Sequence, residues 1–135
     1  MLEQYKEEIG ALLGVPTAAE IEFFYQKPED GRILLGQYDY TRSKLRINTF
    51  PIYHYSAADS YDLLETIRHE MRHAYQYAAT AGMYRYGYIN VYGEDWDTMV
   101  QWDLNIDNYI SPDEDRFAYE EQVIEVDARN FSGEQ

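Results

Sequence analysis

Two histidines and a glutamate with the spacing of a zinc site lie within "IRHEMRHAYQ", residues 67–76. A helix places His69 and His73 on one face, one turn apart, so both imidazoles can reach the same zinc ion. Glu70 then lies beside the first ligand, where a carboxylate can take a proton from a zinc-bound water. The H-E-x-x-H pattern therefore predicts a hydrolytic zinc centre with Glu70 as its general base.

The residues around the motif predict the helix that carries it, over about residues 57–81. Ser56 with Asp59 has the capping-box pattern of a helix start, and Gly82 suits the position after a helix end. A chance H-E-x-x-H on a solvated helix surface is the alternative. The motif's separation from the apolar stripe of the helix favours a metal site. This stripe comprises Leu63, Leu64, Ile67, Met71, Ala74 and Ala78.

A third protein ligand is needed if one coordination position is to be left for water. The chain has no cysteine, and its only other histidine is His54, before the helix. No histidine follows the motif, so a carboxylate on a later helix is favoured over His54. Glu114 in "YISPDEDRF" and Glu125 in "YEEQVIEVDARNF" are the main alternatives, although Glu114 also suits a capping role with Ser111.

The motif followed by "AYQ", with the later pattern Y-x-x-Q-x-x-E-x-D-A-x-x-F, resembles small zinc metallopeptidases of the zincin type. It resembles most closely the gluzincin branch and its small single-domain bacterial and phage members. The resemblance spans roughly residues 32–131 and is strongest over 60–77 and 119–131. It implies a zincin-like domain in which Glu125, on a second helix, is the third zinc ligand.

The same resemblance implies hydrolysis of peptide bonds with one zinc ion per chain. A donor that stabilises the oxyanion is also required, and ligands are often oriented by further hydrogen bonds. The candidates are Tyr119, Tyr109 and His54 for the oxyanion donor, and Asp127 for the orienting residue.

The rest of the sequence predicts an α+β fold in one domain, residues 1–135. Three strand candidates within residues 21–50, joined by "KPEDG" and "TRS", suggest a small antiparallel or mixed sheet, most simply a meander. This sheet is expected to pack on the motif helix. Further predicted elements are helices at 2–13 and 112–131, a short helix within 94–108, and a hairpin or irregular loop at 83–93.

Residues 103–114, "DLNIDNYISPDE", also resemble an EF-hand calcium loop. Asp103, Asn105, Asp107, Ser111 and Glu114 fall at ligand positions of that loop. The position that requires glycine for the sharp turn is occupied by asparagine, so an acidic loop leading into a helix is favoured over a Ca²⁺ site.

Composition limits the classes of molecule that the protein is expected to bind. The net charge is −14, which disfavours nucleic acid and anionic membrane surfaces and favours a basic peptide or polypeptide. The absence of cysteine, of an apolar span and of a signal-peptide pattern leads us to expect a cytoplasmic protein.

Three functions fit these observations. The first is a zinc metallopeptidase that acts through a zinc-activated water. The second is a non-catalytic, zincin-like binding module, although Glu70 has no purpose in a purely structural site. The third is a bacterial or phage protease that cuts a single target and is inert on generic substrates.

Overall fold

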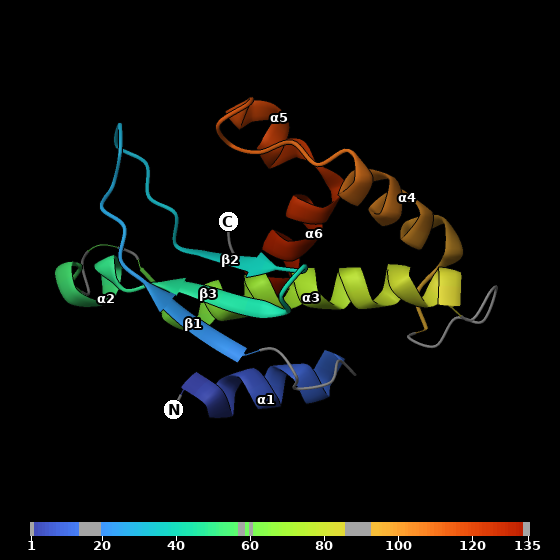
Figure 1. Cartoon of the computed structure of the whole chain (residues 1–135), viewed down its shortest axis with the longest axis horizontal. Helices are drawn as coiled ribbons and strands as arrows, with labels where there is room; N and C mark the ends of the chain where they lie inside the picture. Colours follow the sequence, from blue (N-terminus) through green and yellow to red (C-terminus); the bar gives the residue numbers. More distant parts are fainter. Residues whose placement is uncertain (1, 14–19, 57–58, 60, 86–92, 134–135) are drawn as a thin grey trace.

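The computed structural model describes residues 2–13, 20–56, 59, 61–85 and 93–133. Within these ranges the chain forms three strands and six helices, so the predicted α+β class is confirmed (Figure 1). The elements in chain order are α1 (Leu2–Leu13), β1 (Glu20–Phe24), β2 (Gly36–Asp39), β3 (Lys44–Asn48), α2 (Phe50–His54), α3 (Leu63–Arg85), α4 (Trp96–Asp107), α5 (Arg116–Glu121) and α6 (Val123–Ser132).

The three strands form a mixed sheet in the order β1-β3-β2, so the predicted meander is wrong. β3 pairs in parallel with β1 and antiparallel with β2. After β1 the chain runs out to a turn closed by a bridge between Glu29 and Arg32, and then returns. It forms β2 on the far side of β3, which makes β2 an edge strand.

The buried side chain of Asn48, at the end of β3, holds this excursion in place. Its Oδ1 accepts hydrogen bonds from the backbone N–H groups of Gln26 and Phe50, at 3.1 and 3.0 Å. Its Nδ2 donates to the carbonyl oxygens of Gln26 and Leu34, at 2.9 and 2.8 Å. The segment after β1 and the segment before β2 are therefore both fixed beside β3.

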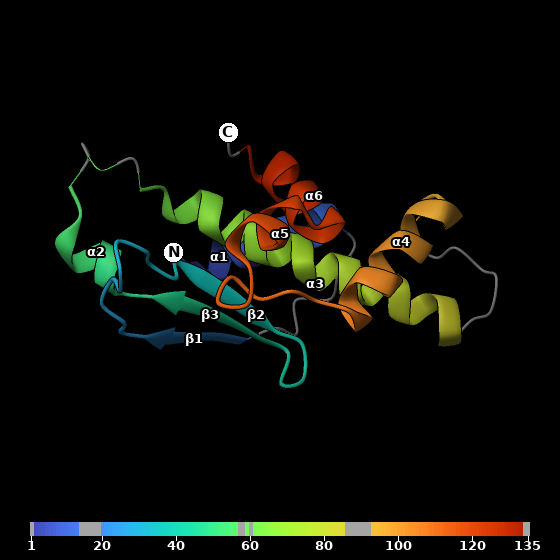
Figure 2. The ribbon, with the colours of Figure 1, turned by 90° about the horizontal axis from the view of Figure 1, so that it is seen from above.

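Helix α3 lies at the centre of the fold and packs against β2, β3, α1, α4 and α6. Figure 2 shows α3 between the sheet and the C-terminal helices. Apolar burial on both sides of α3 fixes the helix that carries the H-E-x-x-H motif. One core cluster contains Leu45, Ile47, Ile67 and Met71, and the other contains Tyr75, Ala79, Met99, Trp102 and Ile124.

The ends of α3 differ from the prediction. The Asp62 carboxylate accepts hydrogen bonds from two backbone N–H groups in the first turn, so the helix begins after Asp62 and not near residue 57. Ser56 and Asp59 form the expected capping pair, but it closes a turn outside the helix. Gly82 lies within the helix, which continues to Arg85.

The predicted helix at 112–131 is two helices. Gln122 has φ −61° and ψ 142°, which is extended backbone and separates α5 from α6. Ser111 and Glu114 form reciprocal capping hydrogen bonds, but these close a turn. The helix begins only after Asp115, whose carboxylate accepts from the backbone N–H of Ala118.

The predicted short helix within 94–108 is confirmed as α4. Asp103, Asn105 and Asp107 lie in its last turns, where side chains two residues apart point in different directions. The EF-hand interpretation of residues 103–114 is therefore wrong. The prediction for 83–93 falls largely on residues 86–92, outside the described residues. Among the helices that the structure describes, none is long and apolar enough to span a membrane.

Candidate metal centre

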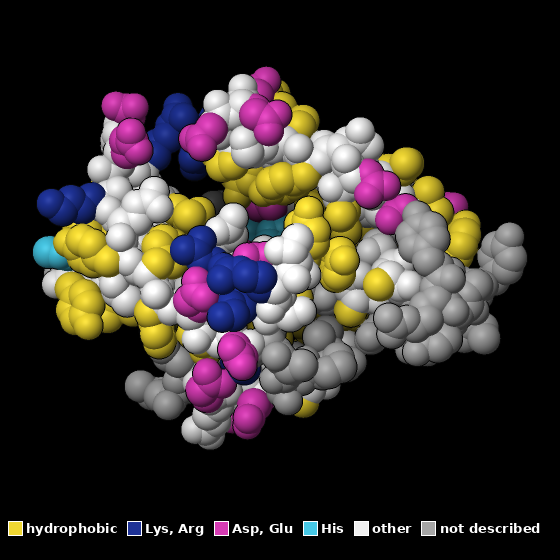
Figure 3. Space-filling model, viewed as in Figure 1, with side chains coloured by type: hydrophobic (Ala, Val, Ile, Leu, Met, Phe, Trp, Pro, Cys, Tyr) yellow, Lys and Arg dark blue, Asp and Glu magenta, His cyan; other side chains and the backbone are white. Residues whose placement is uncertain are grey.

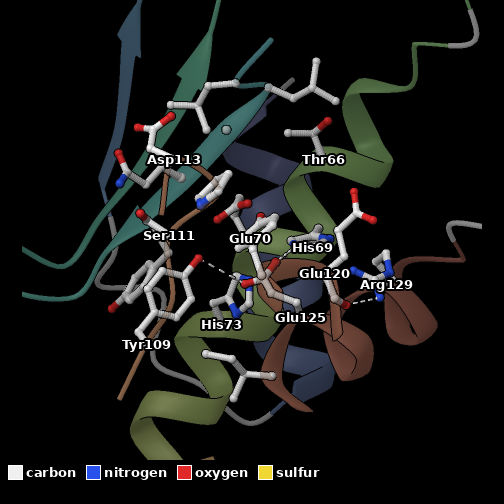
Figure 4. Close-up of a pocket in the computed structure, with 18 of the residues that line it drawn as sticks. Thr66, His69, Glu70, His73, Tyr109, Ser111, Asp113, Glu120, Glu125 and Arg129 are labelled. Carbon is white, nitrogen blue, oxygen red and sulfur yellow. Dashed lines mark hydrogen bonds and ion pairs between the residues drawn. The ribbon is translucent and has the colours of Figure 1, made fainter. Parts of the chain in front are cut away.

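Helices α3 and α6 bring together the residues of the predicted metal site (Figure 4). His69 and His73 lie one turn apart on α3, and Glu125 lies in the first turn of α6. The Nε2 atom of His69 is 3.2 Å from Oε1 of Glu125, and the Nε2 atom of His73 is 2.9 Å from Oε2. A single carboxylate, 2% exposed, therefore contacts both imidazoles.

This donor set fits a zinc ion. Ligand atoms at tetrahedral zinc lie about 2.0–2.1 Å from the metal, which places neighbouring ligands about 3.3 Å from one another. The two nitrogen-to-oxygen distances, 3.2 and 2.9 Å, are close to that value. Two imidazoles with one carboxylate is also a ligand set of hydrolytic zinc sites.

A second choice of three ligands uses Glu70 in place of Glu125, since ligand atoms of His69, Glu70 and His73 lie within 4.8 Å of one another. We favour Glu125 because it contacts both imidazole nitrogens directly. Glu70 follows His69 directly, and its carboxylate accepts a hydrogen bond from the backbone N–H of Tyr38.

The charges at this centre favour a proton or a metal ion between Glu125 and the imidazoles. Burial alone would raise the pKa of Glu125, but the hydrogen bonds from His69 and His73 lower it well below its ordinary value. Burial would lower the pKa of His73, but contact with Glu125 raises it above its ordinary value. The carboxylate is therefore ionised, and the imidazole beside it favours a positive charge.

Glu70 has the environment of a base. It is 8% exposed, and burial raises its pKa, which brings proton uptake closer to neutral pH. Strand β2 lies close beside it at Gly36, where a Cβ atom would be 3.3 Å from Cγ of Glu70. Strand β2 therefore borders the side chain of Glu70.

Two of the three oxyanion candidates lie at the centre. The hydroxyl of Tyr109 is 3.5 Å from Oε2 of Glu125, and its ring meets that of Tyr119 edge to face at 6.2 Å. Burial and the negative charge of Glu125 raise the pKa of both tyrosines, so both hydroxyls keep their protons and can donate.

The other two sequence candidates lie elsewhere. His54 is on α2, where its Nε2 is 3.0 Å from the hydroxyl of Tyr25, and it does not line the cavity above the centre. Glu114 is exposed and bonded to Ser111, and it is likewise not among the lining residues.

The cavity above the centre has a volume of about 1260 Å³. Strand β2 and the segment before it form one wall, α3 forms the floor, and residues between 106 and 125 form the other wall. Figure 3 looks into this hollow, and histidine and acidic atoms are visible at its base. The stacked rings of Tyr40 and Tyr77, 5.1 Å apart, also border it.

Glu125 is positioned by two side chains that sequence reasoning missed, Gln122 and Asn105. Gln122 pairs with both backbone groups of Ile110, accepting from the N–H at 2.7 Å and donating to the carbonyl at 2.8 Å. Asn105 donates to Gln122 and accepts from the backbone N–H of Ile124. We call these hydrogen bonds of Gln122 and Asn105 the clamp. The Q of the Y-x-x-Q-x-x-E pattern was the only sequence signal for it.

Asp127, the candidate orienting residue, accepts hydrogen bonds from Gln76 and from Arg72. It therefore lies one side chain away from His73, because Gln76 also contacts that imidazole at 2.9 Å. The role of Gln76 was not predicted, although it lies in the "AYQ" run after the motif.

The chain matches no protein-family model, no curated protein and no solved structure. A functional assignment therefore depends on the chemistry of the site itself.

Proposed function

We propose that this protein is a zinc-dependent metallopeptidase whose zinc ion is held by His69, His73 and Glu125. The observation that carries the proposal is the Glu125 carboxylate, which contacts both imidazoles of the H-E-x-x-H motif from a separate helix. The zincin resemblance of the sequence supports the same ligand set. A zinc ion bound there supplies Lewis-acid chemistry to a hydrolytic reaction.

The chain's own residues then have distinct tasks. Glu70 takes the proton of the attacking water and passes it to the leaving amine, as its buried position and raised pKa favour. Tyr109 and Tyr119 remain protonated beside Glu125, so either hydroxyl can donate a hydrogen bond to the developing oxyanion.

The cavity wall favours a peptide as substrate. β2 is an edge strand, and its residues line the cavity. An extended peptide can add to such an edge through backbone hydrogen bonds, which brings its carbonyl groups over the floor of the cavity. The net charge of −14 favours basic peptides over acidic ones.

Replacing Glu70 with glutamine tests the proposal. The amide keeps the shape of the side chain but accepts no proton, so Glu70→Gln is expected to retain one zinc per chain. Its hydrolysis of a library of basic peptides should fall by about 10²–10⁴-fold. Glu7→Gln, an exposed change on α1, is the matched control and should behave as the parent.

Two outcomes separate the alternatives. Equal cleavage by Glu70→Gln and the parent would overturn the mechanism. One bound zinc with no cleavage of any library peptide or of casein would favour the single-target protease or the non-catalytic module.

A further inference from the structure

Two stacked tyrosines border the cavity beside the candidate centre. Tyr77 lies on α3 four residues after His73, so the two side chains share a face of the helix and are about 6 Å apart along its axis. Tyr40 directly follows β2. The two rings have centres 5.1 Å apart and planes inclined by 29°, and both line the cavity. They form an aromatic wall one helical turn from a proposed metal ligand.

The alternation of side chains along β2 explains why Tyr40 meets α3. Tyr38 is paired with Leu45 of β3, whose side chain is buried in the core cluster that also contains Ile67 of α3. Residues opposite one another in a sheet share a face, and residues two apart along a strand share it as well. Tyr38 and Tyr40 therefore face α3, where Tyr77 completes the stacked pair.

The two ends of the cavity differ in chemistry. β2 and α3 run in the same direction (Figure 1), with Gly36 beside Thr66 at one end and Tyr40 beside Tyr77 at the other. The charged turn at 29–32 also lines the cavity, and it precedes β2, so it lies toward the Gly36 end. The cavity is therefore charged at the start of β2 and aromatic after its last residue.

The free surface of the tyrosine pair fits a flat apolar group. Tyr40 is 50% exposed and Tyr77 is 38% exposed, so each ring keeps accessible area although it stacks on the other. Asp39 alternates to the opposite face of the strand, where its carboxylate accepts from Nε of Arg42 at 2.7 Å. An aromatic side chain can stack on the free ring surface, whereas a guanidinium placed there gains no ion pair from this strand.

The pair is within reach of a peptide held along β2. An extended chain advances about 3.3 Å per residue. The separation of about 6 Å between His73 and Tyr77 along α3 therefore corresponds to roughly two residues of such a peptide. The side chain that meets the tyrosine pair belongs to a residue close to the bond that lies over the metal centre.

We propose that Tyr40 and Tyr77 form a subsite for an aromatic side chain of the peptide substrate, and that this subsite determines which bond is cut. The inference rests on the proposed peptidase function. Binding of a peptide to the metal-free chain can nevertheless be measured without hydrolysis, so a failure of the subsite can be told from a failure of the function.

The first experiment measures binding. The probes are capped heptapeptides Ala-Lys-Ala-X-Ala-Lys-Ala, in which X is phenylalanine, alanine or arginine, and NMR titration of the metal-free protein gives their dissociation constants. The phenylalanine peptide should bind about 3–10-fold more tightly than the alanine peptide, the usual size of one aromatic pair. Equal dissociation constants, or tightest binding of the arginine peptide, would overturn the proposal.

The second experiment removes one ring. In Tyr77→Ala the preference for phenylalanine over alanine should fall to less than about 2-fold, whereas Tyr77→Phe keeps a ring and should keep the preference. Tyr53→Ala is the matched control, because Tyr53 is 76% exposed on α2 and does not line the cavity. Tyr40→Ala removes the other ring and covers the case in which Tyr77→Ala does not fold. A full preference in either folded alanine variant would contradict the subsite.

The third experiment follows hydrolysis with zinc added. In a longer capped peptide of alternating alanine and lysine, moving a single phenylalanine by two positions should move the cleaved bond by two positions, as read by mass spectrometry. Cleavage that ignores the phenylalanine would refute the subsite and leave the peptidase function intact. Tighter binding of the phenylalanine peptide without hydrolysis of any probe would refute the proposed function alone.

Discussion

The two halves of the candidate centre are built by different means. His69, Glu70 and His73 lie within five residues of one helix, and the helical repeat alone aligns them. Glu125 lies at the same centre but belongs to α6, which begins after the extended residue Gln122. The first half depends on local backbone geometry, and the second half depends on hydrogen bonds between distant segments.

The two histidines can therefore be recognised from local sequence, whereas the third ligand depends on how distant segments pack. A helix of the right register presents two histidines regardless of what surrounds it. The carboxylate arrives only because Gln122 and Asn105 join the start of α6 to α4 and to the segment at Ile110. Variants at Gln122 or Asn105 should therefore disturb the site by moving α6, whereas variants at His69 or His73 should act on the ligands alone.

The largest expected effect is that of removing the ligand that α6 contributes. Glu125→Ala should weaken zinc binding by more than about 100-fold, above the range for losing a mere orienting group. Glu114→Ala, which removes an exposed carboxylate bonded to Ser111, should leave affinity unchanged. Chelator competition measures both. Loss in Glu114→Ala with retention in Glu125→Ala would reverse the assignment.

The next effect concerns the clamp. Gln122→Ala removes an amide that is 7% exposed and bonded to both backbone groups of Ile110. Leaving these groups unpaired should lower the free energy of unfolding by about 2–3 kcal/mol, measured by urea denaturation. Zinc affinity should fall as well, because Glu125 is three residues away. The exposed Gln101→Ala should change neither, and stable zinc binding in Gln122→Ala would show that α6 needs no clamp.

The part of the candidate centre on α3 could be predicted from the sequence more fully than the part on α6. The residue types and spacing at His69, Glu70 and His73 sufficed to predict one face of α3. Glu125 was chosen through a resemblance, and the residues alone left Glu114 open. The bounds of α3 were misplaced because Asp62 competes with Ser56 for the helix start, and nothing local decides between two good caps.

The strand order was missed for a related reason. Alternation of apolar residues identifies strands but does not say which strands pair. Here the pairing depends on Asn48, which binds both ends of the eleven-residue segment 25–35 between β1 and β2. A polar residue buried at a strand end is visible only once the fold brings its partners together.

The smallest predicted effect tests whether the helical half is as local as its spacing suggests. A Cβ atom at Gly36 would lie 2.9 Å from Cγ2 of Thr66, 3.1 Å from the carbonyl oxygen of Arg46 and 3.3 Å from Cγ of Glu70. Gly36→Ala should therefore push β2 away from α3 and cost about 1 kcal/mol of unfolding free energy, at the low end for overpacking because two of the three neighbours are side chains.

Thr66→Ser provides the matched comparison, because it deletes Cγ2 and keeps the hydroxyl that donates to the carbonyl of Asp62. In the double variant the cost of Gly36→Ala should shrink, and a thermodynamic cycle measures that coupling. Hydrolysis should fall several-fold in Gly36→Ala while zinc affinity stays constant, since the three atoms nearest to the added Cβ include one of Glu70 and none of the histidines. Unchanged stability and hydrolysis would mean that Glu70 owes its position to α3 alone.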